Sequence, residues 1–272
     1  MRKSILIISF IFLTTNLFSQ KLTLDEVEKD LQKTYKKILL NRIETDTINW
    51  GLLESENKIF REKIINYTSN YPSTLTYSFD SLKKEKIDIV SSEDKLFRIY
   101  SWETWLGGTM RDFGNVFQYK LNDIVCAIPN DTEPEINKYD YYTPFYSEIF
   151  TLKSNTKTYY LAVYNGIYST KDCSQSIQIF TIENDTLNNN VKLIKTKKGL
   201  VSSIDVYFDF FSVAERPERP LRLIKYDKEK KIIYIPIVVE DGKVTNRYIL
   251  YQFNGKYFEH IETQKPKPKN KT

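Results

Sequence analysis

The sequence has one histidine, two cysteines and eight glycines among its 272 residues, and this scarcity excludes several kinds of chemistry. A metal site rich in histidine is excluded. A Ser-His-Asp or Cys-His arrangement would have to use the lone His260, which lies near the end of the chain. The motifs GxSxG, HExxH and GxGxxG and the P-loop are absent. The sequence therefore indicates no cofactor and no metal ion.

A basic binding face is also lacking, although the net charge is +5. Arg2 and Lys3 lie in the first residues, and four more positive charges are the lysines at positions 265, 267, 269 and 271. Without these six charges the rest of the chain has a net charge of −1. Nucleic-acid binding requires a clustered positive surface, so it is not expected.

Residues 1–19 have the pattern of a signal peptide. Two basic residues precede an apolar run from Ile5 to Leu13, and Ser19 is a small residue at a suitable cleavage point. Such a run is too short to cross ~30 Å of hydrocarbon as a permanent helix, and no later run approaches about 18 apolar residues. Cleavage and export to the periplasm or beyond are predicted, with an uncleaved anchor as the alternative.

Export would place Cys126 and Cys173 in an oxidising compartment, where a disulfide between them could persist. The alternative is that each thiol fills a gap in the core by itself. Sequence spacing does not fix the distance between two Cα atoms, so both alternatives stay open.

Residues 20–72 are predicted to form a helical hairpin. Thr23 and Glu26 have the spacing of a capping box, and apolar residues such as Leu31 and Ile38 then recur at helical spacing. A second amphipathic stretch follows and ends before Pro72. Packing of these apolar stripes against the rest of the chain is the expected use, and docking of a partner is the alternative.

Residues 73–262 are predicted to form an antiparallel β domain. From about Thr74 apolar and polar residues alternate, first at Leu75, Tyr77 and Phe79, and turn-forming pairs such as Asn184-Asp185 separate the later runs. This pattern predicts about a dozen strands and a fold of the α+β class that is mostly β. Residues 263–272, rich in lysine and proline, are predicted to be a disordered basic tail.

The strands show a weak repeat. Polar turns ending at Lys95 and Lys157 are 62 residues apart, and the turns at Asn122 and Asn184 have the same separation. A third, longer copy fits if residues 199–220 are an insertion. The repeat predicts blade-like meanders, but a closed propeller needs about four to eight blades, so a curled or stacked assembly of sheets is favoured.

The most informative segment runs from Tyr100 to Gly114, because three of the eight glycines and two of the three tryptophans fall within it. Such a loop could hold a sugar between flat aromatic faces and charged groups, which makes it the predicted ligand-binding site. The residues concerned are Trp102, Glu103, Trp105, Arg111 and Asp112. The alternative is a structural loop whose tryptophans cover the sheet core.

Two pairs of carboxylates are weak candidates for catalysis. Glu103 and Asp112 could act as the acid and base of a glycoside hydrolase if their separation suited the reaction. Asp205 and Asp209 share one face of a predicted strand with Tyr207 and could bind a cation or act on a glycan. The alternative for the second pair is the solvent-facing side of a half-buried strand.

The chain resembles a group of exported proteins of unknown function from Bacteroidota. The resemblance is carried by Ser91–Trp102, by Gly107–Met110, by Asn115–Tyr119 and by the leader ending in Phe18-Ser19-Gln20. It implies export and a β-rich fold, and it assigns no catalytic residue.

The leading hypothesis is a non-enzymatic module of the periplasm or cell surface that binds a glycan or an envelope protein. One alternative is a carboxylate-based glycan hydrolase. The other is a structural partner protein that docks through its helical hairpin.

Overall fold

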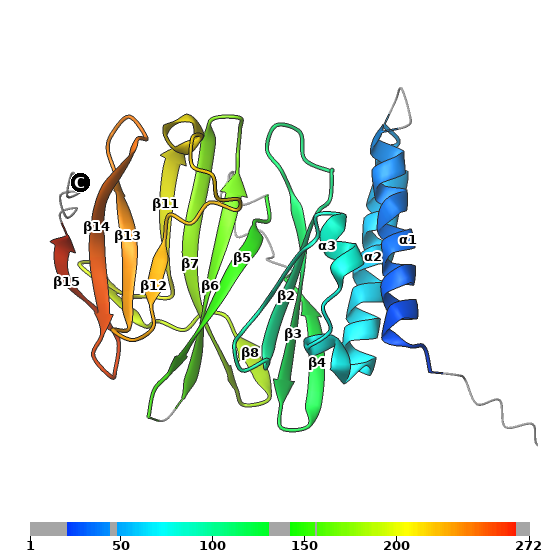
Figure 1. Ribbon diagram of the computed structural model, residues 1–272, viewed down its shortest axis with the longest axis horizontal. Coiled ribbons are helices and arrows are strands. Elements are labelled where there is room, and N and C mark those ends of the chain that lie inside the picture. The colour runs from blue at the N-terminus through cyan, green and yellow to red at the C-terminus, as the bar shows by residue number, and fades with distance from the viewer. Residues whose placement is uncertain (1–20, 44–47, 131–141, 156, 265–272) are drawn as a thin grey trace, which may run out of the picture.

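The protein is a stack of three β-sheets with a pair of helices packed on one end. The computed structural model describes residues 21–43, 48–130, 142–155 and 157–264. Figure 1 shows the layers in chain order, from the two helices at the right to the last sheet at the left. The predicted α+β class, mostly β, is confirmed. The predicted signal peptide and residues 265–272 of the predicted tail lie outside the described residues.

The helical layer consists of α1 (Leu24–Ile43) and α2 (Trp50–Asn70), followed by a short α3 (Asp80–Lys84). The predicted capping box starts α1: the Thr23 backbone N–H donates to Glu26 Oε2 over 2.8 Å, and the Glu26 N–H donates to Thr23 Oγ1 over 3.3 Å. Asn49 caps α2 by accepting from the Leu52 N–H. Among the described helices, none has the length and apolar content needed to span a bilayer.

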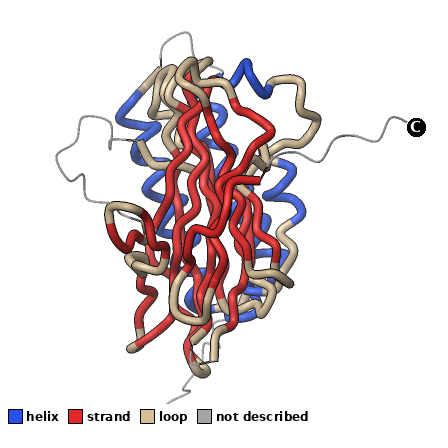
Figure 2. The backbone as a smooth tube through the Cα atoms, turned by 90° about the vertical axis from the view of Figure 1, so that its left-hand side faces the viewer, coloured by secondary structure: helices blue, strands red, loops and turns tan. Residues whose placement is uncertain are grey.

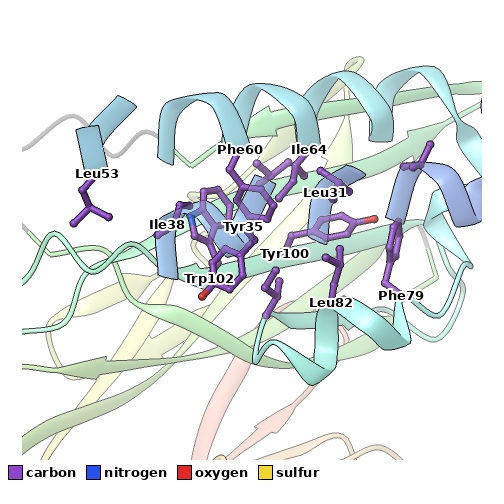
Figure 3. Close-up of a cluster of buried hydrophobic side chains, with 13 residues drawn as sticks. Leu31, Tyr35, Ile38, Leu53, Phe60, Ile64, Phe79, Leu82, Tyr100 and Trp102 are labelled. Atoms are coloured by element: carbon purple, nitrogen blue, oxygen red, sulfur yellow. The ribbon is translucent and has the colours of Figure 1, made fainter. Parts of the chain in front are cut away.

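Sheet A lies directly beneath these helices and is an antiparallel meander in chain order. Its strands are β1 (Asp88–Ser91), β2 (Phe97–Glu103), β3 (Phe113–Leu121) and β4 (Ile124–Pro129). Apolar side chains of α1, α2 and α3 meet those of β2 and β3 in one buried cluster that includes Leu31, Phe60 and Trp102 (Figure 3). The predicted stripes are therefore largely used for packing, while Leu52 and Ile59 of α2 remain exposed.

Sheet B is the middle layer, with the strand order β11-β7-β6-β5 and β8 paired to β7. Its strands are β5 (Phe145–Lys153), β6 (Thr158–Ile167), β7 (Asp172–Glu183), β8 (Thr186–Asn188) and β11 (Ser203–Asp209). Asn184 and Asp185 both have positive φ, so the predicted turn joins β7 to β8. An aromatic cluster that includes Phe97, Phe117 and Phe180 fills the space between sheets A and B.

Sheet C is the last layer, in the order β10-β9-β15-β14-β13-β12. Its strands are β9 (Ile194–Thr196), β10 (Gly199–Val201), β12 (Lys225–Asp227), β13 (Ile232–Val238), β14 (Val244–Phe253) and β15 (Phe258–Gln264). An aliphatic cluster that includes Ile177 and Ile233 joins it to sheet B. Figure 2, seen from the sheet C end, shows that the strands of successive sheets are aligned along roughly the same axis.

Two predictions about the fold are wrong in detail. Residues Pro72–Leu75 form a 3-10 helix (η1) rather than the start of a strand, and Phe79 has a φ of 51°. The Arg98 guanidinium donates to the backbone carbonyls of Thr74 and Tyr77. These carbonyls therefore accept hydrogen bonds from a side chain and not from the backbone of a neighbouring strand. β15 extends into the predicted tail, where Gln264 is still paired with β14.

The three sheets form an open stack, and the predicted propeller-like repeats are not confirmed. The regularity breaks within the predicted insertion at residues 199–220, because β10 joins sheet C and β11 joins sheet B. After β11 the chain forms a second 3-10 helix, η2 (Phe210–Val213), before it returns to sheet C.

The disulfide suggested by the sequence is not present. Cys126 lies in β4 of sheet A and Cys173 in β7 of sheet B, and both are free thiols. They pack into different apolar clusters, Cys126 between sheets A and B and Cys173 beside Phe208 and Val213. Each thiol thus fills a gap in the core, which was the alternative.

Candidate functional site

Trp102 belongs to the core and does not offer a surface for a ligand. Its side chain is 1% exposed, it meets the Phe60 ring edge-on at 5.1 Å, and its indole N–H donates to Asn57 Oδ1 over 3.1 Å (Figure 3). Gly114 lies opposite it in the β2–β3 pair, and a Cβ there would be 2.1 Å from the indole ring. The prediction that Trp102 binds a ligand is therefore wrong, because a glycine on β3 lets the indole lie between the sheet and α2.

Trp105 also faces the helical layer. It is partly buried, packs against the cluster that contains Trp102, and has a φ of 60°. The Arg42 guanidinium lies 5.8 Å from the centre of its ring. Trp102 and Trp105 thus help to hold the helices on sheet A. They do not form the aromatic platform that the sequence suggested.

Glu103 and Asp112 have separate partners. Glu103 Oε2 lies 3.3 Å from Arg111 Nη1, and burial raises the pKa of the Glu103 carboxyl while Arg111 acts in the opposite direction. Asp112 accepts from the Thr104 hydroxyl over 2.8 Å and from the Thr143 backbone N–H over 3.1 Å. Asp112 therefore ties the loop to the segment before β5, which is a structural task.

The second pair of carboxylates lies on β11, where the predicted alternation is observed. Asp205 and Tyr207 are exposed, whereas Val206 and Phe208 are buried. Asp205 Oδ1 accepts from the Tyr164 hydroxyl over 2.9 Å, and burial is the main cause that raises the pKa of Tyr164. Asp205 is thus a solvent-facing residue with a phenol partner.

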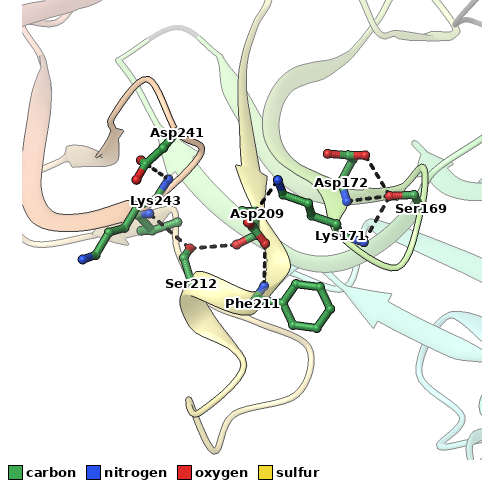
Figure 4. A network of polar contacts seen from close by, with 9 residues as sticks. Ser169, Lys171, Asp172, Asp209, Phe211, Ser212, Asp241 and Lys243 are labelled. Atoms are coloured by element: carbon green, nitrogen blue, oxygen red, sulfur yellow. Dashed lines mark hydrogen bonds and ion pairs between the residues drawn. The ribbon is translucent and has the colours of Figure 1, made fainter.

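Asp209 belongs to a network that joins sheet B to sheet C (Figure 4). Its carboxylate accepts from the Phe211 N–H over 2.8 Å, which caps η2, and lies 3.6 Å from the Lys171 ammonium. Its backbone N–H donates to the Gly242 carbonyl in the β13–β14 turn, and Ser212 bridges the same turn from η2. The network connects the two sheets, and its hydrogen bond and ion pair engage the Asp209 carboxylate that a catalytic role would need.

A pocket of about 520 Å³ opens at one end of sheet B, and we call it the arginine pocket. It brings together the second half of the glycine-rich loop, the β6–β7 turn, and the segments around Phe208 and Pro220. Its polar lining residues include Thr109, Arg111, Asn165, Ser169, Thr170, Ser174 and Arg219, and its apolar lining includes Phe145, Phe208, Phe210 and Leu221. Of the five predicted ligand-binding residues, Arg111 lines it.

One buried amide positions a wall of the arginine pocket. Gln175 is fully buried, and its Nε2 donates to the Leu221 carbonyl over 2.6 Å and to Asn165 Oδ1 over 2.8 Å. Its Oε1 accepts from the N–H groups of Leu223 and Ile224. The side chain thereby fixes the segment after Pro220 against sheet B.

The two arginines are held at the rim by backbone contacts. The Arg111 backbone N–H donates to the Ile167 carbonyl over 2.9 Å, which anchors the loop to β6. The Arg219 guanidinium donates to the carbonyls of Ala214 and Arg216 and lies 5.6 Å from the Phe210 ring. Sequence inspection missed Arg219; the alternating charges and prolines of residues 215–220 were the available signal.

The arginine pocket offers binding groups rather than catalytic groups. Burial raises the pKa of the Cys173 thiol to about 11, so the thiol is protonated at neutral pH and is a poor nucleophile. None of the four candidate carboxylates lines the pocket. Within the described residues there is also no group of three or more His, Cys, Asp or Glu side chains that could hold a metal ion.

A second pocket, of about 490 Å³, lies between turns of the three sheets and carries charges of both signs. Lys153, Lys228 and Lys231 line it together with Glu93 and Asp94, and Lys228 forms an ion pair with Glu93. Its charges are largely matched within the lining itself.

No protein-family model matches the chain, and no curated protein matches it.

Proposed function

We propose that the chain is an exported, non-enzymatic binding module and that its ligand, a glycan or a part of an envelope protein, occupies the arginine pocket. The observation that carries the proposal is the composition of this pocket: guanidinium, hydroxyl and amide groups beside aromatic rings, with no carboxylate among the described lining residues. Ligand sites of about 300–1,000 Å³ commonly combine an apolar wall with a few fixed polar groups. The signal-peptide pattern of residues 1–19 supports export.

Binding is favoured over hydrolysis because the candidate carboxylates are engaged elsewhere. Glu103 pairs with Arg111, Asp112 and Asp209 hold backbone segments together, and Asp205 accepts from Tyr164. A glycoside hydrolase needs two carboxyl groups facing each other across a cleft. Docking through the helices is less favoured, since most of their apolar surface is packed on sheet A.

Gly108 provides a direct test of the proposed site. It lines the arginine pocket, and a Cβ at this position would meet no atom within 4 Å. Gly108→Phe is therefore expected to fill the pocket without distorting the backbone, whereas Gly108→Ala is the matched control. The mature protein and both variants are unfolded thermally with a panel of envelope oligosaccharides and peptides.

A ligand at 100 times its Kd should stabilise the mature protein and the alanine variant by about 2.7 kcal/mol. The phenylalanine variant should show no such shift. If no panel member stabilises the mature protein, or if the phenylalanine variant responds equally, the proposed function is wrong.

A further inference from the structure

We infer that the arginine pocket selects sugars that carry a carboxylate over neutral sugars. This inference rests on the proposed function and adds the ligand class. The ionisable lining residues are Arg111, Arg219 and the Cys173 thiol, so the described lining contributes positive charge and no negative charge. The second pocket differs, because lysines and carboxylates line it together.

Arg219 has a charge that its own contacts leave uncompensated. Its guanidinium donates to the backbone carbonyls of Ala214, Arg216 and Glu218, and these groups fix its position without bringing a negative charge. A guanidinium held in this way is preorganised, which lowers the entropy lost when an anion binds.

Arg111 has a carboxylate partner that a ligand could replace. Its contact with Glu103 is a single one, through Nη1, and half of the Arg111 side chain is exposed. Ion pairs of this kind contribute little net free energy in water. A ligand carboxylate can instead form a bidentate pair with the planar guanidinium, which is the stronger arrangement.

The rest of the lining fits the body of a sugar. Phe208 and Phe210 provide apolar surface for the C–H face of a pyranose ring, and Thr170 provides a hydroxyl group beside it. The Ser169 hydroxyl also lines the pocket, but it donates to Asp172 and accepts from two backbone N–H groups. Asn165, which is 8% exposed, adds an amide. An acidic sugar combines the three properties that the pocket would recognise: an apolar face, hydroxyl groups and a carboxylate.

The experiment compares trisaccharides of galacturonic, glucuronic and mannuronic acid with their neutral counterparts made of galactose, glucose and mannose. Affinities are measured by calorimetry on the mature protein. We expect at least one acidic trisaccharide to bind ten or more times more tightly than its neutral counterpart, and the difference should shrink at high salt.

Two variants change the preference in opposite directions. Arg111→Gln removes one of the two guanidinium groups and should lower the ratio of acidic to neutral affinity. Glu103→Gln removes the competing carboxylate and should increase the ratio. Lys153→Gln is the matched control, because it removes a positive charge from the second pocket and should leave the ratio unchanged.

The inference is overturned if acidic and neutral trisaccharides bind equally or if Arg111→Gln leaves the ratio of acidic to neutral affinity unchanged. In these cases binding that is still lost in Gly108→Phe would leave the proposed function intact. If no sugar binds, the inference is overturned, and the peptides of the panel above decide separately whether the proposed function stands.

Discussion

Trp102, near the end of β2, is 1% exposed between the sheet and α2, whereas Gly108, in the loop that follows, has open space where a side chain would lie. The two ends of the segment, around Trp102 and Gly114, belong to the helical layer, and its middle, from Gly108 to Arg111, forms the rim of the arginine pocket. Both parts contain glycines, which made the segment unusual in the sequence. The difference shows that an unusual local composition marks a constrained backbone, and that the space around each residue decides between packing and binding.

The largest expected effect comes from removing the indole in the helical layer. Trp102→Ala should lower the free energy of unfolding by about 3–5 kcal/mol, because it leaves a cavity and leaves the buried Asn57 Oδ1 without its donor. Denaturant titration measures this loss. Trp50→Ala is the matched control, since Trp50 is 52% exposed at the start of α2 and its removal should change stability by about 0.5 kcal/mol or less. Equal losses in the two variants would show that Trp102 is not a core residue.

A smaller effect is expected from adding one methyl group at two glycines of the segment. In Gly114→Ala the new Cβ would lie 2.1 Å from the Trp102 ring, so the indole must move, at a cost of about 1–3 kcal/mol. Gly108→Ala, on the pocket side, should be tolerated with almost no change in melting temperature. The contrast between the helical side and the pocket side of the segment would fail if Gly108→Ala were the more destabilising variant.

The smallest effect on stability is expected at the pocket rim. Arg111→Ala removes an exposed ion pair with Glu103 and should change the free energy of unfolding by about 0–1 kcal/mol. Thermal and chemical unfolding measure the same quantity independently here. If Arg111→Ala lowered the free energy of unfolding as much as Trp102→Ala, the rim would be part of the core. The contrast between the helical side and the pocket side of the segment would then disappear.

Local features of the fold could be predicted from the sequence because they depend on near neighbours. The Thr23–Glu26 capping box, the Asn184-Asp185 turn and the alternation in β11 all appear as expected. The segment from Leu75 to Phe79 shows the limit of this reasoning. Its alternation is typical of a strand, but the carbonyls of Thr74 and Tyr77 accept hydrogen bonds from the Arg98 side chain of β2 and not from a neighbouring strand.

The arginine pocket could not be predicted, because its walls come from segments that lie far apart in the sequence. Arg111 was identified for its place in an unusual loop, whereas Asn165 lies in an ordinary strand pattern, and the alternating charges and prolines around Arg219 did not by themselves indicate ligand binding. In the sequence, nothing distinguishes Gln175 from the other polar residues of its strand. Its task of holding Leu221–Ile224 becomes visible only when the returning chain is seen against sheet B.

The position of β15 has a consequence for the order in which the chain can fold. β15 lies between β14 and β9, and it pairs in parallel with β9 through Phe258↔Ile194 and Glu259↔Lys195. The β9–β10 hairpin therefore has no place in sheet C until residues 258–264 have been synthesised. A chain that emerges from its N-terminus can assemble the helices and sheet A early, while its final layer depends on its last strand. Contacts of such long sequence separation slow folding, so the end of the stack opposite the helices should be the last part to form.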